Sequence, residues 1–141
     1  MLRRITGALA CGLALAAALG ASLPAWGQGT TERVSLGPNS VQGNDSSWGA
    51  ALSADGRFVA FSAASNLVPG DDVFVRDRRT GTIERVSVST GGGQSNGNSY
   101  FPALSADGRF VAFGSWASNL VPGDTKDWHD VFVHDRQAGE P

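Results

Sequence analysis

The sequence contains one stretch of eleven residues twice, Ala51-Leu-Ser-Ala-Asp-Gly-Arg-Phe-Val-Ala-Phe61 and, letter for letter, Ala103 to Phe113. The two copies are 52 positions apart. Shorter matches flank this core in the same order: 32–35 with 84–87, 66–71 with 119–124, and 73–78 with 131–136. One residue and then five are inserted between the later landmarks, so the offset grows along the second copy. A duplicated unit of about 50 residues indicates a repeat architecture.

Each copy divides into four short predicted strands. In the first copy, the first strand ends at Leu52-Ser53, and the other three span 57–62, 72–77 and 83–89. The pair Asp55-Gly56 predicts a tight hairpin, because glycine tolerates positive φ. The stretch 64–70 is predicted to be a loop, since its Pro-Gly pair ends regular structure. No helical periodicity follows position 28, so we expect an all-β chain.

Apolar residues in these strands do not alternate with polar ones. In 58–61 and 73–75, neighbours that point to opposite faces of a sheet are both apolar. A strand with one wet face would alternate, so both faces of these sheets are expected to be buried. Antiparallel four-stranded sheets that repeat and pack face to face on both sides are β-propeller blades. We therefore predict an incomplete propeller of about two blades.

The N-terminus has the pattern of a helical signal peptide. Two arginines precede an apolar run, 5–19, and small residues at 25 and 27 suit a signal peptidase. We predict cleavage after Gly27 and a periplasmic or secreted protein. The alternative is an uncleaved membrane anchor, because 5–23 is close to the ~20 residues that cross a bilayer. The Ala and Gly content and Pro24 favour cleavage, which would leave no membrane span.

Cysteine and charge exclude several classes of protein. The only cysteine, Cys11, lies in the predicted signal peptide, so we expect neither a disulfide nor a thiol nucleophile in the exported chain. Lipidation at Cys11 is a weaker alternative to cleavage. Loss of residues 1–27 removes two of the 11 basic residues and none of the 13 acidic ones, which leaves a net charge of −4. Without a basic patch, nucleic acid is not an expected partner.

The predicted organisation follows from the repeat. Its segments are the signal peptide 1–27, an orphan fourth strand 28–36, blade 1 at 37–89, and blade 2 at 90–141, which lacks its last strand. Known propellers have about 4 to 8 blades, so two blades cannot close a ring. We expect a piece of a longer propeller gene, with self-association of the two-blade unit as the less favoured alternative.

The repeat resembles a known family. The run Ser-Ala-Asp-Gly-Arg-Phe-Val-Ala-Phe, followed by Val-Phe-Val-x-Asp-Arg and a Thr-Gly turn, is similar to the TolB-type, WD-repeat-like β-propeller repeat of bacterial envelope and secreted proteins. The family pattern is Ser-Pro-Asp-Gly, and here Ala54 and Ala106 replace the proline. The resemblance covers roughly 30–140 and is specific for the repeat rather than for a function.

The resemblance implies a non-catalytic binding or scaffold module that engages a protein or peptide partner through its loops. One alternative is a fragment of a propeller-bearing hydrolase, similar to prolyl oligopeptidase, that lacks its catalytic domain. Another is a calcium-stabilised surface protein. We expect no serine in a Gly-x-Ser-x-Gly nucleophile elbow, and no phosphate-binding Gly-x-x-x-x-Gly-Lys motif is present. We therefore expect no catalytic residues and no enzyme activity.

One acidic loop is a candidate metal site. Gly123 to Asp130 carries three carboxylates, Asp124, Asp127 and Asp130. Ca²⁺ takes about 6 to 8 oxygen ligands and suits loops of this kind. The first copy keeps only two acids at this place, so the repeat does not depend on an ion, and a solvated loop without a cofactor is the favoured interpretation. A transition-metal site formed by His129 with Asp127 and Asp130 is a further alternative.

Four aromatic residues are candidates for a partner surface: Trp116, Trp128, Trp48 and Tyr100. Trp48 and Tyr100 occupy equivalent positions before the first strands. They are expected to be wedges between blades, with a role in a binding face as the alternative. Trp116 and Trp128 have no counterpart in the first copy and lie among polar loop residues. We predict that these two form an exposed contact surface.

Overall fold

The computed structural model describes residues 29–65, 68–126 and 128–138, and the predicted signal peptide lies outside them. The chain divides into two units, 1–31 and 32–141. In the first unit, residues 29–31 have no regular structure and are exposed. All elements described below belong to the second unit. Among the described residues, no helix has the length and apolar character to span a membrane.

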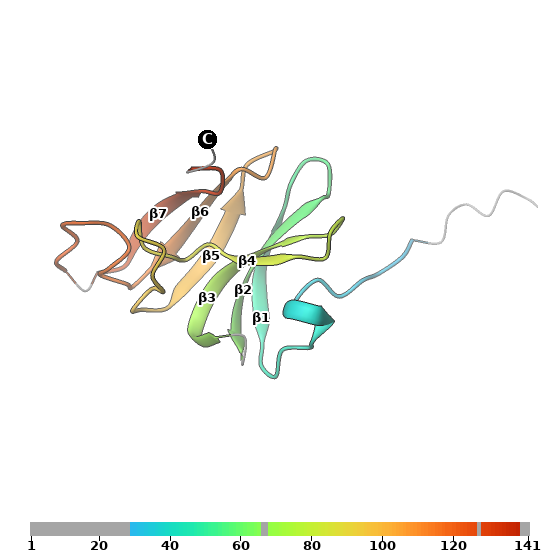
Figure 1. The fold of residues 1–141 in the computed structure, drawn as a ribbon, viewed down its shortest axis with the longest axis horizontal. Helices are drawn as coiled ribbons and strands as arrows, with labels where there is room; N and C mark the ends of the chain where they lie inside the picture. Colours follow the sequence, from blue (N-terminus) through green and yellow to red (C-terminus); the bar gives the residue numbers. More distant parts are fainter. Residues whose placement is uncertain (1–28, 66–67, 127, 139–141) are drawn as a thin grey trace, which may run out of the picture. The chain divides into compact units, whose positions relative to one another are not determined.

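The second unit folds into two antiparallel β-sheets (Figure 1). The first sheet has four strands in chain order: β1 (Ser47–Leu52), β2 (Phe58–Ser65), β3 (Val68–Asp77) and β4 (Ile83–Arg85). The second has three: β5 (Ser99–Leu104), β6 (Phe110–Ser115) and β7 (Asp130–Asp135). A short 3-10 turn, η1 (Pro38–Ser40), precedes β1. These meanders of four and three strands confirm the predicted fold class, an all-β chain of incomplete propeller blades.

The first hairpin of each sheet is built from the repeated turn. The Ser53 hydroxyl donates to the Asp55 carboxylate at 2.6 Å, and that carboxylate accepts the backbone N–H of Arg57 at 3.0 Å. Gly56 has a φ of +71°, which glycine adopts without strain. The turn from Ser105 to Arg109 repeats both hydrogen bonds at 2.6 and 3.0 Å. Identical turn residues therefore give identical hairpins.

The main hydrophobic core lies between the two sheets. The buried core residues on the side of the first sheet are Ala60, Val73, Val75 and Val86. Those on the side of the second sheet are Val111, Phe113, Ala117 and Leu120. Strand β5 lies against β1, β2 and β3. A second cluster, Phe61, Ala63 and Phe74, is buried on the opposite face of the first sheet. The first sheet is thus apolar and buried on both faces, which its unbroken apolar runs predicted.

Two strand boundaries differ from the prediction. The predicted loop at 64–70 is wrong in part, because β2 extends to Ser65 and β3 begins at Val68. The pairing of these strands continues through Ala64 and Asp71 and then shifts register before Ser65. Backbone pairing with β2 therefore outweighs the Pro-Gly signal. The fourth strand is shorter than expected and ends at Arg85.

Residues 29–36, the described part of the predicted orphan strand, do not form a strand. Leu36 makes an isolated bridge with Gln42, and the same bridge recurs between Val88 and Gln94. β4 forms because β3 pairs with it, whereas no described residue pairs in this way with 29–35. The boundaries of the orphan strand and of the two blades stay predictions.

Candidate binding surface

The loop between β6 and β7 carries two of the candidate aromatic residues. Trp116 is 53% exposed and Trp128 is 69% exposed. The Trp116 ring meets the ring of His129 edge to face, with centroids 5.3 Å apart. Residues 123–126 and 128–130 line an open hollow of about 330 Å³. The loop therefore presents aromatic surface beside charged side chains.

The connection between the sheets holds the start of this loop in place. The side-chain oxygen of Asn96 accepts the backbone N–H of Ser118 at 2.9 Å, and its amide nitrogen donates to the Ser118 hydroxyl at 3.0 Å. A Cβ at Gly97 would lie 2.7 Å from backbone atoms of Trp116 and Ala117, so glycine is required for this approach. Trp116 is thus displayed from a backbone that its neighbours fix.

The candidate metal ligands lie in or beside this loop. One carboxylate oxygen of Asp124, Oδ2, is buried and has no hydrogen-bond partner among the described residues. Asp130 is exposed at the start of β7, and Asp127 lies outside the described residues. The described residues contain no cluster of three His, Cys, Asp or Glu side chains. Calcium binding by these acids stays a prediction.

Asp72, the repeat equivalent of Asp130, shows what this acid does in a complete sheet. Asp72 is 1% exposed and accepts the hydroxyls of Ser87 at 2.5 Å and Ser95 at 3.0 Å. Arg85 of β4 lies 3.5 Å away. Ser87 and Arg85 belong to the segment that completes the first sheet, and the described second sheet has no equivalent segment. Asp130 therefore occupies a position that is buried and hydrogen-bonded in the first sheet, but Asp130 itself is exposed.

The expectation that no serine has the Gly-x-Ser-x-Gly spacing is wrong, because Ser95 has it. It lies in Gly93-Gln94-Ser95-Asn96-Gly97. Nucleophile elbows place their serine on a sharp turn from a strand to a helix. Ser95 lies instead in the connection between the sheets, and its hydroxyl donates to the buried Asp72 carboxylate. This serine acts as a structural contact.

Trp48 and Tyr100 lie against each other in the contact between the sheets. Their rings stack with centroids 6.3 Å apart and planes 24° apart, and both residues are half-buried. The Tyr100 hydroxyl donates to the Asp71 carboxylate at 2.6 Å. Burial raises the pKa of Tyr100, and the neighbouring Asp71 charge adds to this effect. The pair occupies the wedge position that was favoured from the sequence.

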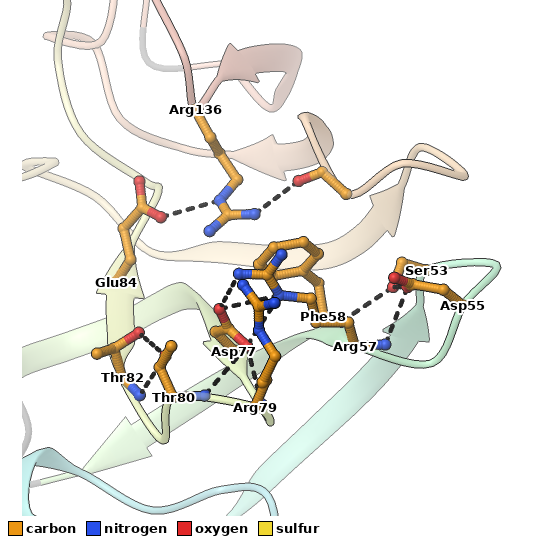
Figure 2. A network of polar contacts seen from close by, with 11 residues as sticks. Ser53, Asp55, Arg57, Phe58, Asp77, Arg79, Thr80, Thr82, Glu84 and Arg136 are labelled. Carbon is orange, nitrogen blue, oxygen red and sulfur yellow. Dashed lines mark hydrogen bonds and ion pairs between the residues drawn. The ribbon is translucent and has the colours of Figure 1, made fainter. Parts of the chain in front are cut away.

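A polar contact that the sequence interpretation missed joins the sheets at their hairpin end (Figure 2). Arg136 donates to the Glu84 carboxylate of β4 at 2.9 Å and to the Gly108 carbonyl at 2.6 Å. The guanidinium groups of Arg136 and Arg57 each lie 4.5 Å from the ring centroid of Phe58. We call Arg136, Glu84, Gly108 and Phe58 the clamp. It links the last strand of one sheet to the first turn of the next.

The clamp is a repeated device. Arg78 donates to the Glu32 carboxylate at 2.5 Å and to the Gly56 carbonyl at 2.6 Å, in the same way as Arg136 binds Glu84 and Gly108. The signal was present in the sequence, since both the acid and the arginine recur in the two copies. Glu32 of residues 32–36 therefore binds the arginine that follows β3 in the same way as Glu84 of β4 binds the arginine that follows β7.

Each sheet also contains an internal ion pair next to the clamp. Arg57 and Asp77 are 2.6 Å apart, and hydrogen bonding from Arg57 holds the pKa of Asp77 well below its ordinary value. Arg109 and Asp135 are 2.7 Å apart, and Arg109 lowers the pKa of Asp135 to about 2. Each carboxylate also accepts a backbone N–H of the turn that follows its strand, from Arg79 at 2.9 Å and from Gln137 at 3.1 Å.

Comparison with known proteins gives structural likenesses but no sequence match. No protein-family model and no curated protein sequence matches this chain. Among solved structures, the chain is similar to the crystal structure of TolB from Acinetobacter baumannii, with 19% sequence identity and a TM-score of 0.46. The likeness covers 68% of this chain and 21% of the TolB chain, so this chain spans about a fifth of that protein.

Proposed function

We propose that this chain is a non-catalytic β-propeller repeat module that binds a protein or peptide partner through the loop between β6 and β7. The observation that carries the proposal is the exposure of two tryptophans on this loop: Trp128 lines an open hollow, and Trp116 contacts His129, which also lines it. Tryptophan is among the residues that contribute most to protein interfaces when it enters a partner's pocket. A fixed backbone at Trp116 lowers the entropy that such binding would cost.

The lining of the hollow indicates the chemistry of the partner. Its volume, about 330 Å³, lies at the lower end of the range for ligand sites and suits a side chain or two of a peptide. The Trp128 ring offers apolar contact, while Lys126 and Asp130 offer one charge of each sign. The loop includes the five residues that only the second copy has, so this surface is not a general property of the repeat.

The place of action follows from the predicted signal peptide, 1–27. If the chain is exported, its partner lies in the periplasm or outside the cell. The other functions considered from the sequence, a hydrolase fragment and a calcium-stabilised surface protein, stay predictions.

A site-specific cross-linker tests the proposed surface. We would place a photoreactive phenylalanine analogue at position 128 of the full chain and illuminate the expressing cells. The expected result is one discrete cross-linked protein, with a yield that Trp116→Ala lowers about tenfold, as loss of an anchor side chain would do. Position 41, another exposed apolar site, is the control. The same adducts at 41 and 128, or none at 128, would rule the surface out.

A further inference from the structure

Equivalent faces of the two sheets have opposite surroundings. The face of the first sheet that meets the second sheet contains Phe58, Ala60, Val73 and Val75. The equivalent residues of the second sheet are Phe110, Ala112, Val131 and Val133, which we call the open face. Val73 and Val75 are 0% and 1% exposed, whereas Val131 and Val133 are 75% and 67% exposed. The open face therefore has the apolar residues of an interface, but no described residue covers it.

We infer that a second copy of this chain covers the open face, and that its residues 32–36 extend the second sheet as a fourth strand. We call residues 32–36 the head segment. The contact is head to tail, because the first sheet of one copy meets the second sheet of another. It goes beyond the proposed function, since it uses the open face and the edge of β7. Of the residues that line the Trp128 hollow, it involves Asp124 and Asp130.

The head segment carries the sequence of the strand that is missing. Glu32-Arg33-Val34-Ser35 is identical to Glu84-Arg85-Val86-Ser87. In the first sheet, Arg85 lies opposite Phe74 and Glu84 lies opposite Val75 of β3. β7 pairs with β6, and no described residue pairs with its other edge. The same register on that edge sets Arg33 of the second copy opposite Phe132 and Glu32 opposite Val133.

The head segment can make this pairing without losing its own contacts. Glu84 pairs with β3 of the first sheet and at the same time binds Arg136 of the second sheet. Glu32 already binds Arg78 of its own first sheet. One face of the head segment is therefore occupied in the same way as that of β4, and its pairing edge is available for β7 of another copy.

Charge supports the same register. Arg85 lies 3.5 Å from the Asp72 carboxylate, and the Ser87 hydroxyl donates to that carboxylate at 2.5 Å. The matching residues of a second copy, Arg33 and Ser35, would stand in the same relation to Asp130. Asp130 is exposed, and strand pairing at β7 would supply it with the partners that bury Asp72.

The sizes of the side chains that would meet support a second copy of this chain as the partner of the open face. At the existing interface, Gly49 in a bulge of β1 faces Pro102, whose side chain would lie 3.4 Å from a Cβ at Gly49. In the second sheet the position of Gly49 is taken by Phe101 of β5, which has a φ of +55° and is 71% exposed. A bulky residue in that conformation is uncommon and strained. In a second copy the position of Pro102 is Ala50, so a large side chain again meets a small one.

A donor and an acceptor also match. At the existing interface, the Tyr100 hydroxyl donates to Asp71. The equivalent of Asp71 in the second copy of the repeat is Asp124, whose Oδ2 is buried without a described partner. The equivalent of Tyr100 in an incoming first sheet is Trp48, whose indole N–H is a donor. Head-to-tail contact brings this donor to the acceptor that lacks one.

The apolar surfaces of the two ends complement each other as well. Leu104 packs against the core between the sheets, while its equivalent, Leu52, is 58% exposed. Gly108 lies directly against the ring of Phe58, while its equivalent, Gly56, has only Arg78 nearby. Contact between copies places Leu52 and Gly56 of one copy against the open face of another, with Gly56 over the Phe110 ring.

A head-to-tail contact continues from copy to copy until the ring closes. Each copy adds its two described sheets to the ring. Two to four copies would therefore give about four to eight blades, the range in which propellers close.

Sedimentation of two complementary variants tests the inference. The protein is purified from cells that express the full 141-residue sequence. The tail variant carries Val131→Lys and Val133→Lys, and the head variant carries Arg33→Glu and Leu52→Lys. All four substituted residues are exposed, so the folded monomer tolerates the changes. The unmodified chain is expected to form a closed oligomer, and each variant alone a monomer.

The mixture distinguishes head-to-tail contact from other association. In an equimolar mixture, the tail variant supplies an intact head segment and first sheet, and the head variant supplies an intact open face. The two variants can therefore form a one-to-one complex and nothing larger. Its formation also shows that both variants are folded. As control, Val41→Lys assembles like the unmodified chain, because its repeat equivalent, Gly93, stays exposed beside the existing interface.

A charge exchange checks the register. Arg33→Glu alone and Asp130→Arg alone each weaken assembly about tenfold or more, because each leaves like charges opposed. The two changes together restore it. A monomeric unmodified chain at about 100 μM, a mixture of the head and tail variants that stays monomeric or grows beyond one-to-one, or a double exchange that restores nothing overturns the inference. A monomer would indicate that another segment or a further repeat covers the open face.

Discussion

Strands β3 and β7 contain nearly the same six residues at 72–77 and 130–135, with Arg76 replaced by His134. β3 lies between β2 and β4 and packs against the second sheet, and its Val73 and Val75 are buried. β7 has one neighbouring strand among the described residues, and its valines are exposed. The comparison teaches that in this repeat the sequence specifies which face is apolar, while the next unit decides whether that face is buried.

The largest difference is expected between Val75→Asp and Val133→Asp, the same substitution at equivalent positions. An unpaired carboxylate at the buried Val75 costs more than about 4 kcal/mol and unfolds most of the chain. At the exposed Val133 the cost stays within about 0.5 kcal/mol. Urea unfolding followed by circular dichroism, at a protein concentration low enough to keep the chain monomeric, measures both. Equal losses of stability would break the comparison.

A second pair is Gly108→Ala and Gly56→Ala, at equivalent turns with φ of +76° and +71°. A side chain in that conformation costs about 1 to 2 kcal/mol at either site. At Gly108 the added methyl would also lie 2.3 Å from the Phe58 ring, so a total near 3 kcal/mol is expected there. In a Phe58→Ala background the two substitutions should cost the same. A difference that survives Phe58→Ala would show that the ring is not its cause.

A third pair is Arg136→Gln and Arg78→Gln. The first removes the arginine of the clamp between the two sheets, and the second removes its equivalent, which binds the head segment. Arg136 is mostly buried and holds Glu84, Gly108 and the Phe58 ring, so its loss is expected to cost about 2 kcal/mol. Arg78 is more exposed and the change there should cost less than half as much. Thermal unfolding of the two variants gives the ranking, and a larger loss at Arg78 would contradict it.

The smallest expected effect is a pH dependence that both sheets share. Arginine lowers the pKa of Asp77 and of Asp135, so each pair stabilises the folded chain fully above the ordinary carboxyl pKa of about 4. That stability is lost as the pH falls, for Asp135 down to about 2. Urea midpoints between pH 2 and 6 should therefore fall less steeply in Arg57→Gln and in Arg109→Gln than in the unmodified chain. Unchanged slopes would mean that these pairs contribute nothing to the acid dependence.

Much of the fold could be predicted from the repeat. The identity of 51–61 with 103–113 and the doubly apolar strands led directly to stacked four-stranded sheets. The start of β3 at Val68 could not be predicted from local turn signals, because pairing with β2 decides it. The short β4 and the unpaired residues 32–36 likewise depend on which strands lie beside them, and local sequence does not carry that information.

The candidate surface was predictable only where the two copies differ. Trp116 and Trp128 stood out because the first copy lacks them, and they are exposed. The clamp at Arg136 was missed because its partners lie 28 and 52 positions away in sequence. Ser95 shows the converse, since its Gly-x-Ser-x-Gly spacing suggests a nucleophile and its place in the fold gives it a structural role.

Amide hydrogen exchange of β3 and β7 at two protein concentrations tests the central claim most directly. If the neighbour decides burial, the β3 amides that pair with β4 are protected at both concentrations. The equivalent β7 amides then exchange fast in dilute solution and become protected as copies associate. Protection of β7 equal to that of β3 in a dilute monomer would contradict the claim.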